Sequence, residues 1–232
     1  MREEMGSDAM FNDLSAGWDD RSTTRGMMEL VKGWMVSQKW WNPPFDGPAM
    51  DFGCGTGLLT MALLDKLGTN VAGVDPSRGM LDEFDKKAAG KGVKTFPIEL
   101  TGPGQLGEGA DESFALVYTS LVLHHIQDCQ SAVTTLAGYL RPGGRMLLFD
   151  FEASENAHLF HPPEYEIGNQ LEHHGIAAKD LRAWCENTEV LEDIQIDYMP
   201  FRKEAGGQGV GFGSGVEFQM LALSCVKKSS PE

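Results

Sequence analysis

The sequence has no long apolar segment, and positive charge is scarce in it. Of its 232 residues, 34 are Asp or Glu and only 19 are Lys or Arg, so the formal net charge is -15 with neutral histidines. A negative surface repels the phosphate backbone of nucleic acids and anionic lipid headgroups. No apolar run reaches the roughly 20 residues of a membrane span, and none follows the charged N-terminus. We therefore expect a cytoplasmic protein with no nucleic-acid partner and no membrane partner.

Cysteine is also sparse, and its spacing excludes the common zinc motifs. The four cysteines contain no Cys-x-x-Cys pair, and no His-x-x-x-His pattern completes a zinc site. We expect reduced, mostly buried thiols. Cys54 lies inside a glycine-rich loop, where a small side chain matters more than a thiol.

Apolar residues and glycine are present in quantity. Hydrophobic residues make up 41% of the chain, which is enough for a full core and too much for a disordered acidic protein. A single domain is expected from the length. Glycine is in excess, since 28 of the 232 residues, about 12%, are glycine, against a usual share of about 7%.

Short apolar runs alternate with amphipathic ones through the middle of the chain. Alternating strands and helices are typical of a parallel sheet covered on both faces, so we expect an α/β fold, a Rossmann-like three-layer sandwich. The spacing of apolar residues predicts strands over 48–52, 70–75, 93–98, 114–119 and 145–151, and helices over 58–67, 77–89 and 131–140.

Four regions of one domain, residues 1–232, follow from this pattern. Residues 1–45 form a tryptophan-rich helical cap, residues 46–152 the core, residues 153–180 a histidine-dotted insertion, and residues 181–232 a final helix with two strands near 190–198 and 218–226. The glycine-rich stretch 206–215 is predicted to be a mobile hairpin connection. No helix follows it to supply the free amides of a phosphate site.

Spaced glycines follow the first core strand. Gly53, Gly55 and Gly57 lie where ligands bind in open parallel sheets, outside the carboxyl end of a strand. Asp75 ends the next strand and is placed to accept hydrogen bonds from both hydroxyls of a ribose. A dinucleotide site requires Gly-x-Gly-x-x-Gly, and Leu58 occupies the last of those positions, which disfavours an NAD-dependent reductase. The pattern predicts a nucleotide-containing ligand.

Four segments in order resemble the motifs of class I S-adenosylmethionine-dependent methyltransferases, nearest to the ubiquinone and menaquinone biosynthesis enzymes. These are Asp-Phe-Gly-Cys-Gly-Thr-Gly at 51–57, Val-Asp-Pro-Ser at 74–77 with Met80, Ser-Leu-Val-Leu-His-His-Ile at 120–126, and Leu-Arg-Pro-Gly-Gly-Arg at 140–145. The resemblance covers about residues 50–152. It implies a seven-stranded sheet with an antiparallel last strand, S-adenosylmethionine as cofactor and S-adenosylhomocysteine as product.

The resemblance also implies the cofactor contacts. Asp75 would hold the ribose, Met80 would pack near the adenine, Gly53 and Gly55 would face the methionine part, and Asp51 would lie beneath its ammonium group. Trp18 resembles an aromatic that closes over the cofactor. The full expected set is Trp18, Asp51, Phe52, Gly53, Cys54, Gly55, Gly57, Asp75, Pro76, Ser77, Met80, Glu99, Leu100 and Thr119.

Histidines are the candidates for chemistry. Methyl transfer chiefly needs alignment, but a group near neutral pKa helps an acidic acceptor, and His124 and His125 follow the fourth strand. In enzymes of this kind the insertion over 153–180 builds the acceptor pocket. We expect Phe160, His161, Tyr165 and His173 to contact the acceptor. His161 with His173 or His174 could supply metal ligands, but no fixed spacing supports this, so no metal is expected.

The function predicted by these motifs is methyl transfer to a small-molecule acceptor. A protein acceptor with a basic segment is the main alternative, since the acidic charge disfavours RNA. A non-catalytic regulatory protein that keeps the cofactor site is the other.

Overall fold

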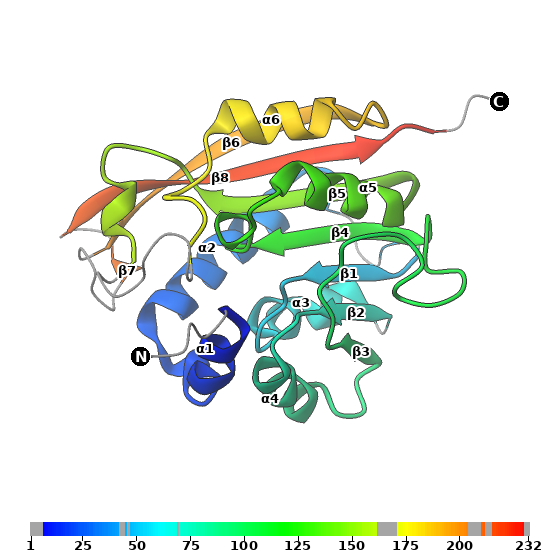
Figure 1. The fold of residues 1–232 in the computed structure, drawn as a ribbon, viewed down its shortest axis with the longest axis horizontal. Helices are drawn as coiled ribbons and strands as arrows, with labels where there is room; N and C mark the ends of the chain where they lie inside the picture. Colours follow the sequence, from blue (N-terminus) through cyan, green and yellow to red (C-terminus); the bar gives the residue numbers. More distant parts are fainter. Residues whose placement is uncertain are drawn as a thin grey trace, which may run out of the picture.

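A computed structural model describes residues 7–41, 45, 47–68, 70–161, 171–203, 210–211 and 215–229. One sheet runs through the molecule in the order β3-β2-β1-β4-β5-β8-β6-β7, with helices on both sides (Figure 1). Its strands are β1 (Ala49–Phe52), β2 (Val71–Val74), β3 (Val93–Phe96), β4 (Phe114–Ser120), β5 (Leu140–Phe151), β6 (Leu191–Lys203), β7 (Val210–Gly211) and β8 (Val216–Lys227).

The strand directions confirm the predicted fold class. Strands β1 to β5 pair in parallel, and β8 is antiparallel to both β5 and β6. The two-residue β7 is additional and pairs with the end of β6. It lies within 206–215, so part of the predicted connection is an edge strand, while residues 206–209 and 212–214 lie outside the described residues.

Helices cover the two faces because neighbouring strand residues point to opposite sides. Leu116 and Tyr118 of β4 pack toward α2 (Ser22–Ser37) and α3 (Leu58–Leu67), whereas Val117 packs toward α5 (Cys129–Tyr139) and α6 (Ala178–Glu186). The remaining helices are α1 (Ser7–Leu14), α4 (Arg78–Ala88) and the short 3₁₀ turns η1 (Trp18–Asp20), η2 (Leu123–His125) and η3 (Ala157–Leu159).

Two strand boundaries differ from the sequence prediction. Strand β5 begins at Leu140, five residues before the start of the strand predicted over 145–151. Leu140 pairs with Phe114, and the register then shifts before Leu116 pairs with Arg145, which accommodates the left-handed Gly143 within the strand. Strand β6 continues to Lys203 because β8 pairs with it along its length.

The carboxyl ends of β1, β2, β4 and β5 meet at one edge of the sheet, where strand order reverses between β1 and β4. That edge positions the candidate site. Among the described residues, no helix is both long and apolar enough to cross a bilayer. The cytoplasmic location stays a prediction.

Candidate functional site

The glycine loop turns directly out of β1. The N–H groups of Gly53 and Cys54 both donate to the carbonyl of Val74, at 2.8 and 3.1 Å, which fixes the loop against the end of β2. Gly53, Gly55 and Gly57 all have positive φ, and Gly57 precedes α3 as its N-cap. The sequence folds this way because three left-handed residues in five exclude a continuing strand or helix.

Gly55 and Gly57 serve different purposes in this loop. A Cβ on Gly55 would meet no atom within 4 Å, so the backbone there faces open space. A Cβ on Gly57 would lie 2.1 Å from the ring of Phe84. Gly57 is not among the residues that line the cavity described below, so packing against Phe84 of α4 explains the glycine at this position, and its cofactor contact stays a prediction.

Asp75 joins the glycine loop to the start of α4. One carboxylate oxygen accepts the N–H of Gly55 at 2.8 Å, and the other accepts the N–H of Ser77 at 2.8 Å. The carboxylate also lines the cavity described below. Ser77 itself is buried as the N-cap of α4, with its hydroxyl accepting from Met80, and it does not line the cavity.

Asp51 lies buried beneath the loop. Its carboxylate accepts a hydrogen bond from Thr60 at 2.5 Å, and the Thr60 hydroxyl also contacts Tyr118 at 2.6 Å. Burial raises the pKa of Asp51 to about 7, and the Thr60 hydrogen bond opposes that rise. A cation brought to this carboxylate would favour its ionised form.

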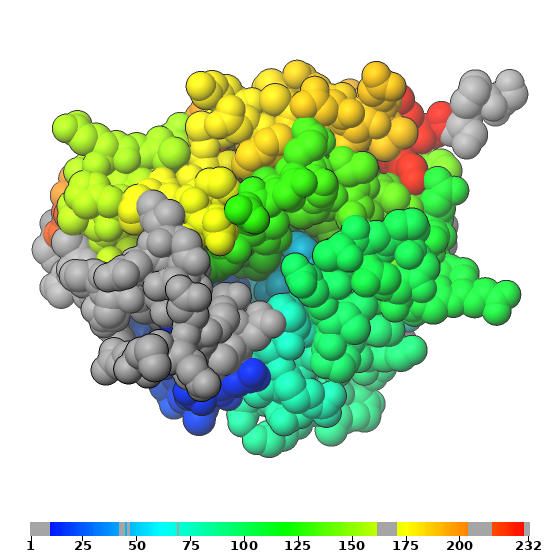
Figure 2. All heavy atoms as spheres, viewed as in Figure 1, coloured from blue at the N-terminus to red at the C-terminus, as the bar shows by residue number. Residues whose placement is uncertain are grey.

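A single cavity of about 720 Å³ joins the loop to the end of β4. Figure 2 shows a hollow on this face between the cyan and green surfaces. Most of the predicted cofactor residues line it: Trp18, Asp51, Phe52, Gly53, Cys54, Gly55, Asp75, Pro76, Met80, Glu99 and Leu100. Thr119, a buried residue of β4, is not among the lining residues.

The N-terminal segment closes one side of the cavity. Phe11 and Trp18 pack edge to face, with ring centroids 5.7 Å apart, and both line the cavity. The Asn12 side-chain oxygen accepts from the hydroxyl of Ser77 and the N–H of Gly79, and Asp19 bonds to Thr56 and Lys87. These bonds hold α1 and η1 over the cofactor loop and α4.

His124 lies at the opposite end of the cavity on η2, directly after β4. Its Nδ1 is 2.8 Å from Asp150 of β5, and its own N–H donates to the other carboxylate oxygen. Burial raises the pKa of Asp150 to about 7, opposed by the backbone N–H groups of His124 and Phe151. Burial lowers the pKa of His124 to about 3, so its imidazole is neutral and a weak base.

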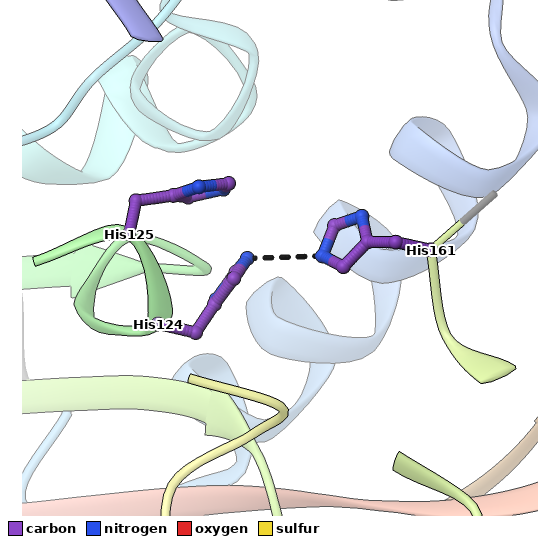
Figure 3. Close-up of side chains that lie close together, drawn as sticks. All are labelled: His124, His125 and His161. Carbon is purple, nitrogen blue, oxygen red and sulfur yellow. Dashed lines mark hydrogen bonds between the residues drawn. The ribbon is translucent and has the colours of Figure 1, made fainter. Parts of the chain in front are cut away.

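His125 and His161 complete this end (Figure 3). The Nε2 atoms of His124 and His161 face each other at 3.2 Å, and the rings of His124 and His125 have centroids 4.0 Å apart. Burial lowers the pKa of His161 to about 2. The ring of Phe160 stacks on that of Phe151 with centroids 4.0 Å apart, and the Lys203 ammonium donates a hydrogen bond to the Phe160 carbonyl.

Only some of the residues predicted to contact the acceptor line the cavity. Phe160 and His161 line the cavity, whereas His173 does not, because its Nε2 bonds to the carbonyl of Ile126. Tyr165 lies outside the described residues. Sequence reasoning did not single out Asp150 or Lys203. A lone carboxylate ending the apolar run of β5 was the signal for Asp150, but nothing local marked Lys203.

Comparison with known proteins supports the motif analysis. Residues 50–148 match the family described as methyltransferase domain. A ubiquinone biosynthesis O-methyltransferase of Rhizobium johnstonii is 35% identical over 102 residues, covering 44% of this chain and 40% of that protein. The aligned part thus spans less than half of that relative's length.

Solved structures agree on the fold. A chain in the complex of the Haloferax volcanii Trm112 methyltransferase activator with a methyltransferase has a TM-score of 0.67 at 14% identity, covering 94% of this chain and 97% of that one. The Haemonchus contortus phosphoethanolamine N-methyltransferase 2, solved with S-adenosyl-L-methionine, has a TM-score of 0.61 at 15% identity, covering 86% of this chain and 56% of that one.

The motifs found in the sequence therefore agree with two findings. One is the fold shared with the solved methyltransferase structures, and the other is the family match over residues 50–148. The comparisons therefore support a methyltransferase domain over residues 50–148, in agreement with the resemblance to class I S-adenosylmethionine-dependent methyltransferases.

Proposed function

We propose that this protein transfers a methyl group from S-adenosylmethionine to a small-molecule acceptor held at the histidine end of the cavity. The proposal rests on one observation, that the cavity is continuous from the glycine loop to the histidines. Asp75 and Gly55 at one end, and His124 and His161 at the other, line the same cavity. A donor and an acceptor bound in it would meet near the end of β4.

The residues at the loop end fit the cofactor. The open space at Gly55 admits a ligand against the backbone, and a side chain there would occupy it. The Asp75 carboxylate lines the cavity and is the kind of group that accepts hydrogen bonds from ribose hydroxyls, and the buried Asp51 carboxylate suits an ammonium group. Ser120 lines the cavity, and its buried hydroxyl has no hydrogen-bond partner among the described residues.

When bound, the cofactor would be held by Asp75, Gly55 and Asp51 and would supply an activated methyl group on a positively charged sulfur. The protein's contribution is alignment and exclusion of water. Leu121 links β4 to η2 with a φ of 60°, an unfavourable angle for leucine that turns the chain so that His124 and His125 line the cavity. These two residues act on the acceptor.

Three features favour a small acceptor. The acceptor end is lined by the rings of Phe160 and His161 and by Lys203. The net charge of -15 disfavours RNA. The relative from Rhizobium johnstonii is described as acting in ubiquinone biosynthesis. A protein acceptor is the second candidate, since a basic peptide would suit the acidic surface.

Two measurements test the proposal. Calorimetry with S-adenosylmethionine and S-adenosylhomocysteine should show one site per chain, and no binding of either at millimolar ligand would refute the cofactor assignment. Transfer of a labelled methyl group into a cell extract, separated by size, should label the small-molecule fraction. Label only in the protein fraction would replace the small-molecule acceptor with the second candidate.

A further inference from the structure

Three histidines converge at the acceptor end from two distant parts of the chain. His124 and His125 come from η2, and His161 follows η3 (Figure 3). One ring nitrogen from each lies within 4.8 Å of the corresponding nitrogens of the other two. Neutral imidazole is a common ligand of zinc and related transition metals.

The Asp150 carboxylate fixes the orientation of His124. Its Oδ1 accepts the N–H of Phe151 at 2.8 Å and lies 2.8 Å from the Nδ1 of His124, while its Oδ2 accepts the N–H of His124. With backbone donors on both oxygens, the carboxylate is the acceptor, so the Nδ1 of His124 carries the hydrogen. The lone pair of His124 is then on Nε2, toward His161. A carboxylate behind a histidine is the usual second partner of a metal-bound imidazole.

The separation of the two facing nitrogens also matches a metal site. Two imidazole nitrogens bound to one tetrahedral zinc ion lie about 3.3 Å apart, given zinc–nitrogen bonds near 2.05 Å. The Nε2 atoms of His124 and His161 are 3.2 Å apart. Since no pair of ligand nitrogens exceeds 4.8 Å, closing the third ligand needs a shift of about 1.5 Å or less. His125, with its ring edge-on to Phe11 at 5.3 Å, can supply it by side-chain rotation.

The surroundings leave one coordination position open. Each of the three histidines lines the cavity, and the Lys203 ammonium is held by the Phe160 carbonyl and lies over the Phe160 ring. Three protein ligands and an open fourth position are the arrangement of catalytic zinc sites, whereas structural sites are closed.

We propose that His124, His125 and His161 bind one divalent transition-metal ion, with zinc the best match, and that the open position receives an oxygen atom of the methyl acceptor. The metal binding stands by itself, while its role rests on the proposed function. A hydroxyl bound to such an ion loses its proton to solvent far more readily than the free hydroxyl. The acceptor would then be an alcohol or phenol, attacking through the resulting oxyanion.

This differs from the sequence expectation that no metal is bound. From the sequence, the only candidate metal ligands were His161 with His173 or His174. In the structure the ring of His173 is hydrogen-bonded to the Ile126 carbonyl. The convergence of His124 with His161 is produced by the fold.

The test uses the full chain, stripped with a chelator and titrated with Zn²⁺ by calorimetry and with Co²⁺ by visible absorption. We expect one ion per chain and the intense absorption of tetrahedral cobalt. His161→Ala should weaken binding by about tenfold or more, and His158→Ala, an exposed histidine outside the cluster, should leave it unchanged. Equal zinc affinity in wild type and His161→Ala, or no tetrahedral cobalt spectrum in wild type, overturns the proposal.

Two further readouts keep the outcome clear. A zinc-induced shift of the His124 ring nitrogen resonances in the unmodified protein tests the same site without any substitution. S-adenosylmethionine binding is measured on the same proteins, and His161→Ala should retain it because His161 lies at the other end of the cavity. Loss of cofactor binding by wild type would refute the proposed function, whereas absence of metal binding alone refutes only this inference.

Discussion

Oδ1 of Asp150 lies 2.8 Å from Nδ1 of His124, and the two side chains are 0% and 1% exposed. A buried carboxylate bonded to a buried imidazole decides which ring nitrogen carries the hydrogen. This pair therefore controls what His124 presents to the acceptor end of the cavity.

Asp150→Asn tests that control. The asparagine amide can donate to Nδ1, which would place the hydrogen of His124 on Nε2 and remove the lone pair from the cavity. We expect methyl transfer to fall by about 10- to 100-fold. The ring nitrogen chemical shifts of His124 should report the tautomer change. Asp193→Asn, at an exposed carboxylate on β6, is the control, and an unchanged tautomer in Asp150→Asn would contradict the assignment.

Asp75→Ala should weaken S-adenosylmethionine binding by roughly 10- to 100-fold, as expected when a charged hydrogen-bond acceptor is removed. The variant also frees the N–H groups of Gly55 and Ser77. Asp75→Asn keeps one acceptor oxygen and should show an intermediate loss. Asp82→Ala, at an exposed residue of α4, should bind normally. Wild-type affinity in Asp75→Ala by calorimetry would remove Asp75 from the cofactor site.

Two glycine substitutions should separate packing from binding. Gly57→Ala places a methyl group 2.1 Å from the Phe84 ring, so we expect a loss of several kcal/mol in unfolding free energy. Gly55→Ala meets no atom and should cost only about 1 kcal/mol from its left-handed φ of 52°. Its methyl group enters the cavity, however, so cofactor affinity should fall. Thermal denaturation and calorimetry on both variants check this, and equal stability losses would argue against it.

Asp51 should contribute a loss of stability as pH rises from about 4 to 7, whereas His124 and His161, whose pKa values are lowered by burial to about 3 and about 2, contribute with the opposite sign up to about pH 6.5. The pKa of Asp51 is about 7 in the folded protein and near 3.8 when unfolded, so the folded state holds a proton that the unfolded state has released in this range. The contribution is on the order of 4 kcal/mol at most. Asp51→Asn should remove this contribution, so the unfolding free energy of wild type minus that of Asp51→Asn should fall as pH rises from about 4 to 7, and a difference that does not vary with pH would contradict the raised pKa of Asp51. The contributions of Asp150, His124 and His161 are present in both proteins and cancel in this difference.

The sequence was sufficient to predict the sheet and to place the glycine loop beside Asp75, because these signals are local. Gly53, Gly55 and Asp75 belong to two short motifs, each next to its strand, so periodicity and motif spacing place them together. The same pattern could not separate Gly55 from Gly57, because only packing shows that Gly57 lies against Phe84.

The acceptor end depends on contacts between distant residues. Asp150 is 26 residues from His124 along the chain, and His161 is 37 residues from it. No spacing rule connects such positions, and the sheet register alone brings β5 beside β4. His173 was predicted to contact the acceptor because it lies in the histidine-containing insertion, but its ring is hydrogen-bonded to the Ile126 carbonyl. Lys203 reaches the cavity only because β6 is longer than its apolar pattern suggested.

The bonds that Asn12 and Asp19 make to Ser77, Gly79, Thr56 and Lys87 have a kinetic consequence. Phe11 and Trp18 lie on the same segment and line the cavity, so a cofactor bound there would contact residues 10–20, and each would stabilise the other. Cofactor binding should therefore slow hydrogen exchange across this segment. Product can leave past this wall only when those bonds open, so the rate of that opening sets an upper limit on turnover by this route.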